Sequence, residues 1–123
     1  MRSYFPRSTK RFAYAIEGVI FLLRTQANAR LHLLATAAVC AAGAGLGLSR
    51  AEWLWITAAI VLVWSAEAFN TALECLADAL HPERDPGVGR AKDVAAAAVL
   101  IAALGAAVIG VLVFVPHLAD WRH

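Results

Sequence analysis

The stretch "SAEAFNTALECLADALHPERDPGVGRAKD" at 65–93 places acidic residues inside a chain that is otherwise suited to lipid. The stretch begins within a long apolar run. An ionisable side chain at membrane depth costs at least a few kcal/mol, so its presence indicates a function. The polar side chains in or beside this run are Glu67, Asn70, Glu74 and Asp78.

The composition around this stretch is that of a membrane protein. Of the 123 residues, 61% are hydrophobic and 16% are charged, which is too apolar for a soluble domain of this size. The length allows one domain. Leu, Ala, Val and Ile dominate the long runs, which favours spanning helices over a barrel. We therefore predict an all-α integral membrane protein. Three helices enclose little core of their own, so we also expect it to oligomerise.

Hydropathy and breaking residues divide the chain into one surface helix and three spans. Apolar residues recur at helical spacing before the first span, which predicts an amphipathic helix at the membrane surface. Ser49 is a candidate N-cap for the second span, and Pro82 ends that span. The predicted segments are a surface helix over 1–30, spans over 31–48, 52–80 and 91–118, and a loop over 81–90.

The basic residues predict the orientation. Nine precede the first span or lie between the second and third, against two on the other side. Basic residues gather on the cytoplasmic side, so we expect a cytoplasmic N-terminus and loop in a bacterial inner membrane. No short apolar core with a cleavage site follows the basic N-terminus, so we expect no signal peptide. The nine are Arg2, Arg7, Lys10, Arg11, Arg24, Arg30, Arg84, Arg90 and Lys92, and the two are Arg50 and Arg122.

The polar residues of the second span share one stripe. At about 100° per residue they fall within an arc about 80° wide and roughly 16 Å long. Acids on one stripe suggest Mg²⁺, which proteins hold through one or two carboxylates together with phosphates. A buried polar network that only joins helices is the alternative. It explains Asn70, but it explains three acids poorly.

The loop beyond the stripe adds groups that suit phosphate. Lys92 and Asp93 open the third span, and a lysine at a helix start attracts phosphate. Neither a Walker A sequence nor a kinase-type glycine-rich loop is present, so any nucleotide site is of another kind. These residues indicate a metal-dependent membrane site suited to phosphoryl transfer.

The motifs "AEAFNTALECLAD" and "GRAKDVAAAAVLIAA" resemble the prokaryotic diacylglycerol kinase family, which includes the undecaprenol kinases. The family pattern is Glu-x-x-Asn-[Ser/Thr]-Ala-x-Glu-x-x-x-Asp, followed by a short loop and Ala-Lys-Asp, and every position is matched. The resemblance covers essentially the whole chain, including "RTQANARLHL" before the first span. It implies a homotrimer with sites shared between subunits, and an ATP- and Mg²⁺-dependent kinase acting on the hydroxyl of a membrane lipid.

The resemblance also implies residue roles. Glu67 is expected to be the catalytic base and Glu74 a metal ligand, with Asn70 and Asp78 in support. One position departs from the family, because Gln26 stands where a metal-binding Glu is usual. Gln offers a carbonyl oxygen without charge, so Gln26 is a doubtful ligand, and an inactive relative is the other interpretation. The expected nucleotide-binding residues are Arg7, Tyr14, Glu74, Glu83, Arg84, Asp85, Lys92 and Asp93.

Other interpretations stay open at this point. A small oligomeric transporter would use Glu67 as a proton or cation site, although it would not need Lys92 and Asp93. A purely structural subunit would not need the acids. Within the kinase family, "NTALE" and "RTQANARLHL" look closer to the undecaprenol branch than to the diacylglycerol branch. The position of His32 at a helix edge favours a hydrogen-bonded structural role for its side chain. No nucleic-acid partner is expected.

Overall fold

The computed structural model describes residues 8–122, with side chains from Lys10 onward. This part of the chain folds into four helices and no strand. Three of them are long and apolar enough to cross a membrane, as predicted, and α4 is by far the most apolar. The helices are α1 (Ser8–Thr25), α2 (Ala27–Leu46), α3 (Arg50–Leu80) and α4 (Pro86–Asp120).

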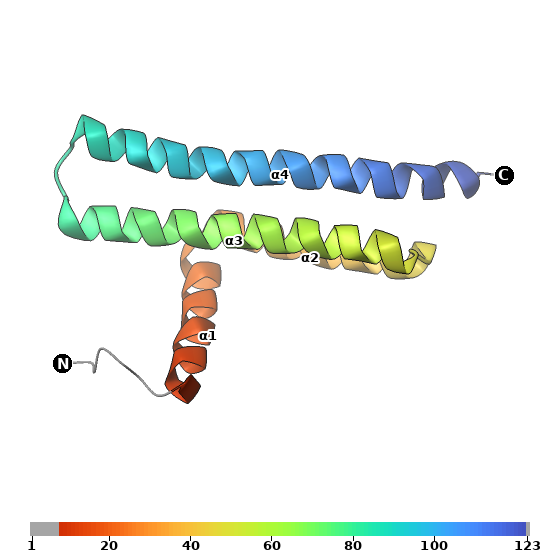
Figure 1. The fold of residues 1–123 in the computed structure, drawn as a ribbon, viewed down its shortest axis with the longest axis horizontal. Helices are drawn as coiled ribbons and strands as arrows, with labels where there is room; N and C mark the ends of the chain where they lie inside the picture. Colours follow the sequence, from red (N-terminus) through yellow and green to blue (C-terminus); the bar gives the residue numbers. More distant parts are fainter. Residues whose placement is uncertain (1–7, 123) are drawn as a thin grey trace.

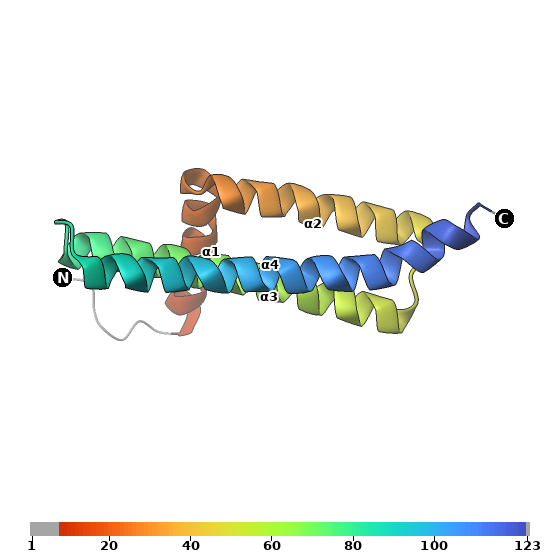
Figure 2. The same cartoon turned by 90° about the horizontal axis from the view of Figure 1, so that it is seen from above.

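The helices α2, α3 and α4 form an elongated bundle (Figures 1 and 2). The helices α3 and α4 lie antiparallel and pack along most of their length, whereas α2 packs on α3. The helix α1 runs transverse to the long helices and meets the bundle where α2 begins (Figure 1). The α3–α4 turn and the start of α4 therefore extend beyond the α1–α2 corner, and the C-terminal end of α4 lies at the opposite end (Figure 2).

A single residue separates α1 from α2. The guanidinium of Arg30 donates hydrogen bonds to the Leu23 and Arg24 carbonyls at 3.1 and 3.2 Å, which satisfies acceptors at the end of α1. The first long helix consequently begins at Ala27, whereas the predicted span began at residue 31, and α1 ends at Thr25 rather than residue 30. The predicted span began after the polar residue Arg30, whose side chain contacts the end of α1.

The α2–α3 turn has both of its helix ends capped. Gly47 takes a left-handed conformation with φ of 70°, and its N–H donates to the Gly43 carbonyl. Ser49 is the N-cap of α3, as predicted. Its hydroxyl accepts from the Glu52 N–H at 3.2 Å, and the Glu52 carboxylate accepts from the Ser49 N–H at 2.7 Å. A Cβ on Gly43 would lie 2.7 Å from the Trp53 ring, so these helices meet closely there.

The α3–α4 turn is shorter than the predicted loop over 81–90. The helix α3 ends before His81 and Pro82, but α4 begins at Pro86, so residues 86–90 are helical. The physical reason is local, because Asp85 caps α4 by accepting from the Val88 N–H at 3.0 Å, and proline suits the first helical position. That hydrogen bond lowers the pKa of the Asp85 carboxyl below its usual range.

At the opposite end, a hydrogen-bonding contact between a histidine and a glutamate joins α3 to α4. The His117 Nε2 lies 3.0 Å from both carboxylate oxygens of Glu52, and both side chains are partly buried. The small apolar core is at this end and centres on Leu48, Ile56 and Val113. Most other large apolar side chains face outward, which suits helices surrounded by lipid or by further subunits.

Candidate active site

Glu67 on α3 is the most deeply buried polar side chain of the bundle. It is 1% exposed, and within residues 8–122 its Oε2 has no hydrogen-bond partner. The nearest group that can carry positive charge is His32 on α2, whose Nε2 lies 3.7 Å from that oxygen. Thr71, one turn further along α3, is also buried, and its hydroxyl has no partner in the described part of the chain.

Asn70 and Glu74 continue the stripe toward the α3–α4 turn. The Asn70 amide nitrogen donates to the Glu74 carboxylate at 3.3 Å. The Asn70 Oδ1 is buried without a hydrogen-bond partner among the residues described. The two side chains are partly buried, so the stripe passes from a fully buried carboxylate to a half-buried one within two turns.

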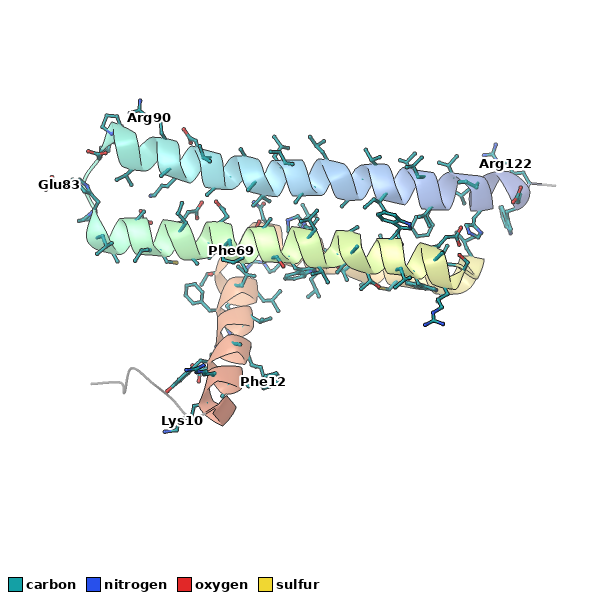
Figure 3. The ribbon with its side chains drawn as sticks, viewed as in Figure 1. Lys10, Phe12, Phe69, Glu83, Arg90 and Arg122 are labelled. Atoms are coloured by element: carbon teal, nitrogen blue, oxygen red, sulfur yellow. The ribbon has the colours of Figure 1, made fainter. Side chains whose placement is uncertain are left out.

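At the turn, the end of the stripe borders a polar cavity. Asp78 forms an ion pair with Lys92 at the start of α4. Figure 3 labels Glu83 in this turn and Arg90 just beyond it, at the same end of the molecule. The cavity has a volume of about 470 Å³, and its lining includes the predicted nucleotide-binding residues Glu83, Arg84, Asp85 and Lys92 together with Asp78.

Three predicted site residues that the structure describes, Tyr14, Asp93 and Gln26, lie outside both the stripe and the lining of the cavity. Tyr14 is on the exposed surface of α1, and Asp93 is exposed beside the cavity without lining it. Arg7 falls outside the described residues. Gln26 stands at the α1–α2 corner, where its side chain is half-buried and its amide nitrogen donates to the Thr25 hydroxyl at 3.3 Å.

The donor set on α3 suits a cation that shares its ligands with phosphate. From residue 10 to residue 122 no three side chains among His, Cys, Asp and Glu gather closely enough to hold a metal alone. What the site does offer is the Glu74 carboxylate and the unpartnered Asn70 carbonyl oxygen one turn away. Mg²⁺ commonly takes one or two carboxylates and completes its octahedron with phosphate oxygens and waters, so these residues fit it.

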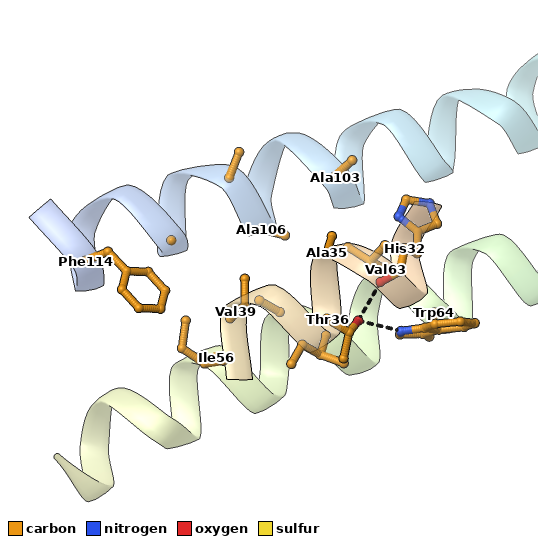
Figure 4. Close-up of a pocket in the computed structure, with 14 residues that line it drawn as sticks. His32, Ala35, Thr36, Val39, Ile56, Val63, Trp64, Ala103, Ala106 and Phe114 are labelled. Carbon is orange, nitrogen blue, oxygen red and sulfur yellow. Dashed lines mark hydrogen bonds between the residues drawn. The ribbon is translucent and has the colours of Figure 1, made fainter. Parts of the chain in front are cut away.

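The sequence prediction missed an apolar cavity beside Glu67. It has a volume of about 300 Å³. Six of its lining residues, from α2, α3 and α4, have side chains too small to fill the space between the helices. His32, Thr36 and Trp64 stand at one end (Figure 4). The Trp64 indole N–H donates to the Thr36 hydroxyl at 3.0 Å. The small residues are Ala35, Ala59, Ala103, Ala106, Ala107 and Gly110.

Comparison with known proteins shows the family of the chain. The sequence profile of prokaryotic diacylglycerol kinase matches residues 13–114. The chain is 36% identical over 117 residues to an undecaprenol kinase of Bacillus subtilis, a match that covers 95% of both chains. It is 34% identical over 114 residues to a diacylglycerol kinase of Synechocystis, which covers 92% of this chain and 65% of that protein. The profile spans most of the chain and one relative aligns almost end to end, and the chain therefore belongs to the prokaryotic diacylglycerol kinase family.

Proposed function

We propose that this lipid kinase transfers the γ-phosphoryl group of ATP, together with Mg²⁺, to the hydroxyl of undecaprenol in the membrane. The observation that carries the proposal is Glu67, a buried carboxylate with an unpartnered oxygen on the same helical stripe that reaches the polar cavity at the α3–α4 turn. Undecaprenol is preferred to diacylglycerol because the relative aligned over 95% of its length is an undecaprenol kinase.

Glu67 has the role of general base. In the proposed step the lipid hydroxyl oxygen bonds to the γ-phosphorus and the bond from that phosphorus to the bridging oxygen breaks. Glu67 takes the hydroxyl proton, and ADP leaves with the electron pair of the broken bond. A base must reach the proton it removes, and the free Oε2 is available for that contact.

The nucleotide belongs in the polar cavity. Lys92 and Arg84 supply positive charge for phosphate, and Lys92 is held by Asp78 until a phosphate competes for it. The Glu83–Asp85 turn would border the nucleoside. We extend the site to Asp93, which belongs to the family motif and lies beside the cavity. Tyr14 on α1 and Arg7 are added on the resemblance to the family alone.

Glu74 is assigned as the metal ligand, with Asn70 and Gln26 as neutral oxygen donors. When bound, Mg²⁺ would neutralise phosphate charge as the phosphoryl group is transferred. The protein's own part is to orient these oxygens, and the hydrogen bond from the Asn70 amide nitrogen fixes one oxygen of the Glu74 carboxylate. With Gln26 in place of a carboxylate, the phosphates would have to supply more of the coordination of Mg²⁺.

The depth of the stripe supports chemistry at the cytoplasmic interface. A hydrocarbon layer about 30 Å thick takes about 20 helical residues, so counting from Trp53 it ends at about residue 72. Glu67 then lies just inside the layer, where a lipid hydroxyl can reach it, and Glu74 lies just outside, where a nucleotide can. The nine basic residues on this side favour a cytoplasmic N-terminus and turn.

A homotrimer with an interfacial α1 completes the proposed architecture. Beyond residue 72, α3 would stand in water, yet Leu76 is 59% exposed and Leu80 is 75% exposed in the single chain. Apolar side chains in water favour burial against further subunits. Phe69, 78% exposed, projects near the α1–α3 contact (Figure 3) but lies within the hydrocarbon layer by the same count, where lipid can cover it.

Lipid-dependent turnover of ATP by the purified protein tests the function. Undecaprenol and diacylglycerol are supplied separately in one micellar system, with and without Mg²⁺, and the phosphorylated lipid is measured. We expect transfer to undecaprenol to be faster and to require Mg²⁺. The Glu67→Gln variant is the matched control. Nucleotide binding without transfer to either lipid would contradict the proposal, and ion flux without ATP turnover would favour the transporter instead.

A further inference from the structure

We propose that His32 is a positioning residue for Glu67, a role that rests on the proposed function of Glu67 as the catalytic base. The two side chains come from different helices, α2 and α3, and face each other at 3.7 Å. In the described part of the chain, His32 is the ion-pairing partner found for Glu67, whose side chain is 1% exposed.

The surroundings hold the His32 ring in place. The ring meets Trp64 edge-on, with centroids 6.5 Å apart and planes at 63°. Its side chain is 17% exposed, and it stands at the end of the apolar cavity (Figure 4). The Thr36 hydroxyl donates to the His32 carbonyl at 2.7 Å and accepts from the Trp64 indole at 3.0 Å. This chain of contacts joins α2 to α3 beside the base.

The imidazole supplies what the Glu67 carboxylate otherwise lacks. A carboxylate among apolar side chains is costly unless a donor or opposite charge faces it. Only an ionised Glu67 can take a proton from the lipid hydroxyl. An N–H on His32 Nε2 would face Oε2 and fix the direction of that oxygen, and both the Nε2–H tautomer of the neutral ring and the protonated ring carry such an N–H.

The alternative interpretation is that His32 has only a structural role and joins α2 to α3. The contacts argue against it, because the Thr36 hydroxyl donates to the main-chain carbonyl of residue 32, and any amino acid at that position would provide this carbonyl. The join between α2 and α3 through Thr36 and Trp64 therefore does not need an imidazole. What requires this side chain is the approach to Glu67.

Three substitutions separate positioning from packing. His32→Leu fills the space without a donor, His32→Gln places an amide N–H near the Nε2 position, and His32→Asn carries the same amide one bond short. We expect His32→Leu and His32→Asn to lower kcat about 10- to 100-fold, the range for losing a charge-assisted contact to the base. The KM for ATP should change less than about twofold, because the nucleotide does not touch His32. His32→Gln should recover most of kcat.

His117 provides a matched control, since it is also a partly buried histidine paired with a glutamate, but at the far end of the bundle. His117→Leu should lower thermal stability and leave kcat unchanged. Full kcat in His32→Leu would overturn the proposal. If that variant does not assemble, equal kcat in His32→Gln and His32→Asn would overturn it, because the two differ only in reach.

A double-mutant cycle distinguishes this inference from the proposed function. If His32 acts through Glu67, adding His32→Leu to Glu67→Gln should not lower the residual rate further. If the double variant instead shows the product of the two single losses in rate, His32 does not act through Glu67. A Glu67→Gln variant that keeps its kcat would mean that the base itself is wrongly assigned. With Glu67→Gln inactive and His32→Leu fully active, the proposed function stands and only the inference fails.

Discussion

Glu67 and Glu74 lie two turns apart on the same face of α3, and the bundle surrounds their carboxylates differently. Glu67 is buried with a free oxygen, whereas Glu74 is half-buried and accepts from Asn70. The positions of both acids could be predicted from helical periodicity. Their different burial could not, because it depends on how α2 and α4 cover α3.

This difference predicts different effects of removing each charge. Glu67→Gln should lower kcat by at least about 100-fold with nucleotide affinity unchanged, because a base acts only in the chemical step. Glu74→Gln should instead raise the Mg²⁺ concentration needed for half-maximal activity. Steady-state kinetics with separate Mg·ATP binding measurements check both. If Glu67→Gln lost ATP binding and kept its turnover at saturating ATP, the two roles would have to be exchanged.

The second prediction concerns Gln26 and the binding of Mg²⁺. A charged oxygen suits Mg²⁺ better than an amide oxygen, so Gln26→Glu should lower the Mg²⁺ concentration for half-maximal activity. The gain should be on the order of 1–2 kcal/mol, as for one charge-assisted contact. A Mg²⁺ titration at fixed ATP measures it, with Gln26→Ala as the comparison. Activity that falls at every Mg²⁺ concentration would mean that the added charge repels the nucleotide.

At the scale of elements, the termini of the helices account for the differences between the predicted and the observed boundaries. Pro86 and Asp85 are typical of a helix start, yet they follow another proline and lie next to glycines, so the sequence also suited a loop. Arg30 could not be assigned to the end of α1 from sequence, since its side chain reaches back across the corner. Ser49 was predictable because its capping box is local.

The Asp85 cap predicts a pH-dependent start of α4. Its pKa is lowered by the Val88 N–H, so its contribution is present above about pH 4, the ordinary Asp range, and is lost as pH falls through the lowered pKa. Asp85→Ala should therefore speed hydrogen exchange at the Val88 amide near neutral pH, with the difference from wild type vanishing in acid. Asp85→Asn keeps a capping oxygen and should show little pH dependence. Equal exchange in all three proteins at pH 7 would rule out the cap.

The close approach of α2 and α3 gives a stability prediction. Gly43→Ala places a methyl group 2.7 Å from the Trp53 ring, and the ring must move. We expect a loss of about 1–3 kcal/mol, as for overpacking. Gly45→Ala is the control on the same helix, since a Cβ there meets nothing within 4 Å and alanine is the better helix former. Thermal unfolding in detergent compares the two, and equal stability would show that the turn yields easily.

At the scale of the whole molecule, composition was enough to predict three spanning helices, because twenty-residue apolar runs have few alternatives. The crossing of α1 and the apolar cavity were beyond prediction from sequence, since they depend on which small residues of three helices meet. The trimer stays a prediction that rests on the family and on apolar side chains without cover.

Topology can be tested in intact cells. After Cys40 and Cys75 are replaced, a single cysteine at position 87 should be unreachable by an impermeant thiol reagent, whereas one at position 122 should react, because basic residues gather at the first end. Lysed cells supply the control, since both positions should then react. Labelling of position 87 from outside would invert the assigned orientation.

The contrast between α3 and α4 has a consequence for biogenesis. The helix α3 carries acids that insertion machinery accepts reluctantly, whereas α4 has no Asp, Glu, Lys or Arg between Val94 and Ala119. The two pack along most of their length and are joined by a turn of only five residues, 81–85. A nascent chain that released α3 before α4 was made would expose Glu67 to lipid before the bundle could enclose it. We therefore expect the ribosome-bound chain to hold α3 at the translocon until α4 emerges, so that the hairpin enters the bilayer as one unit.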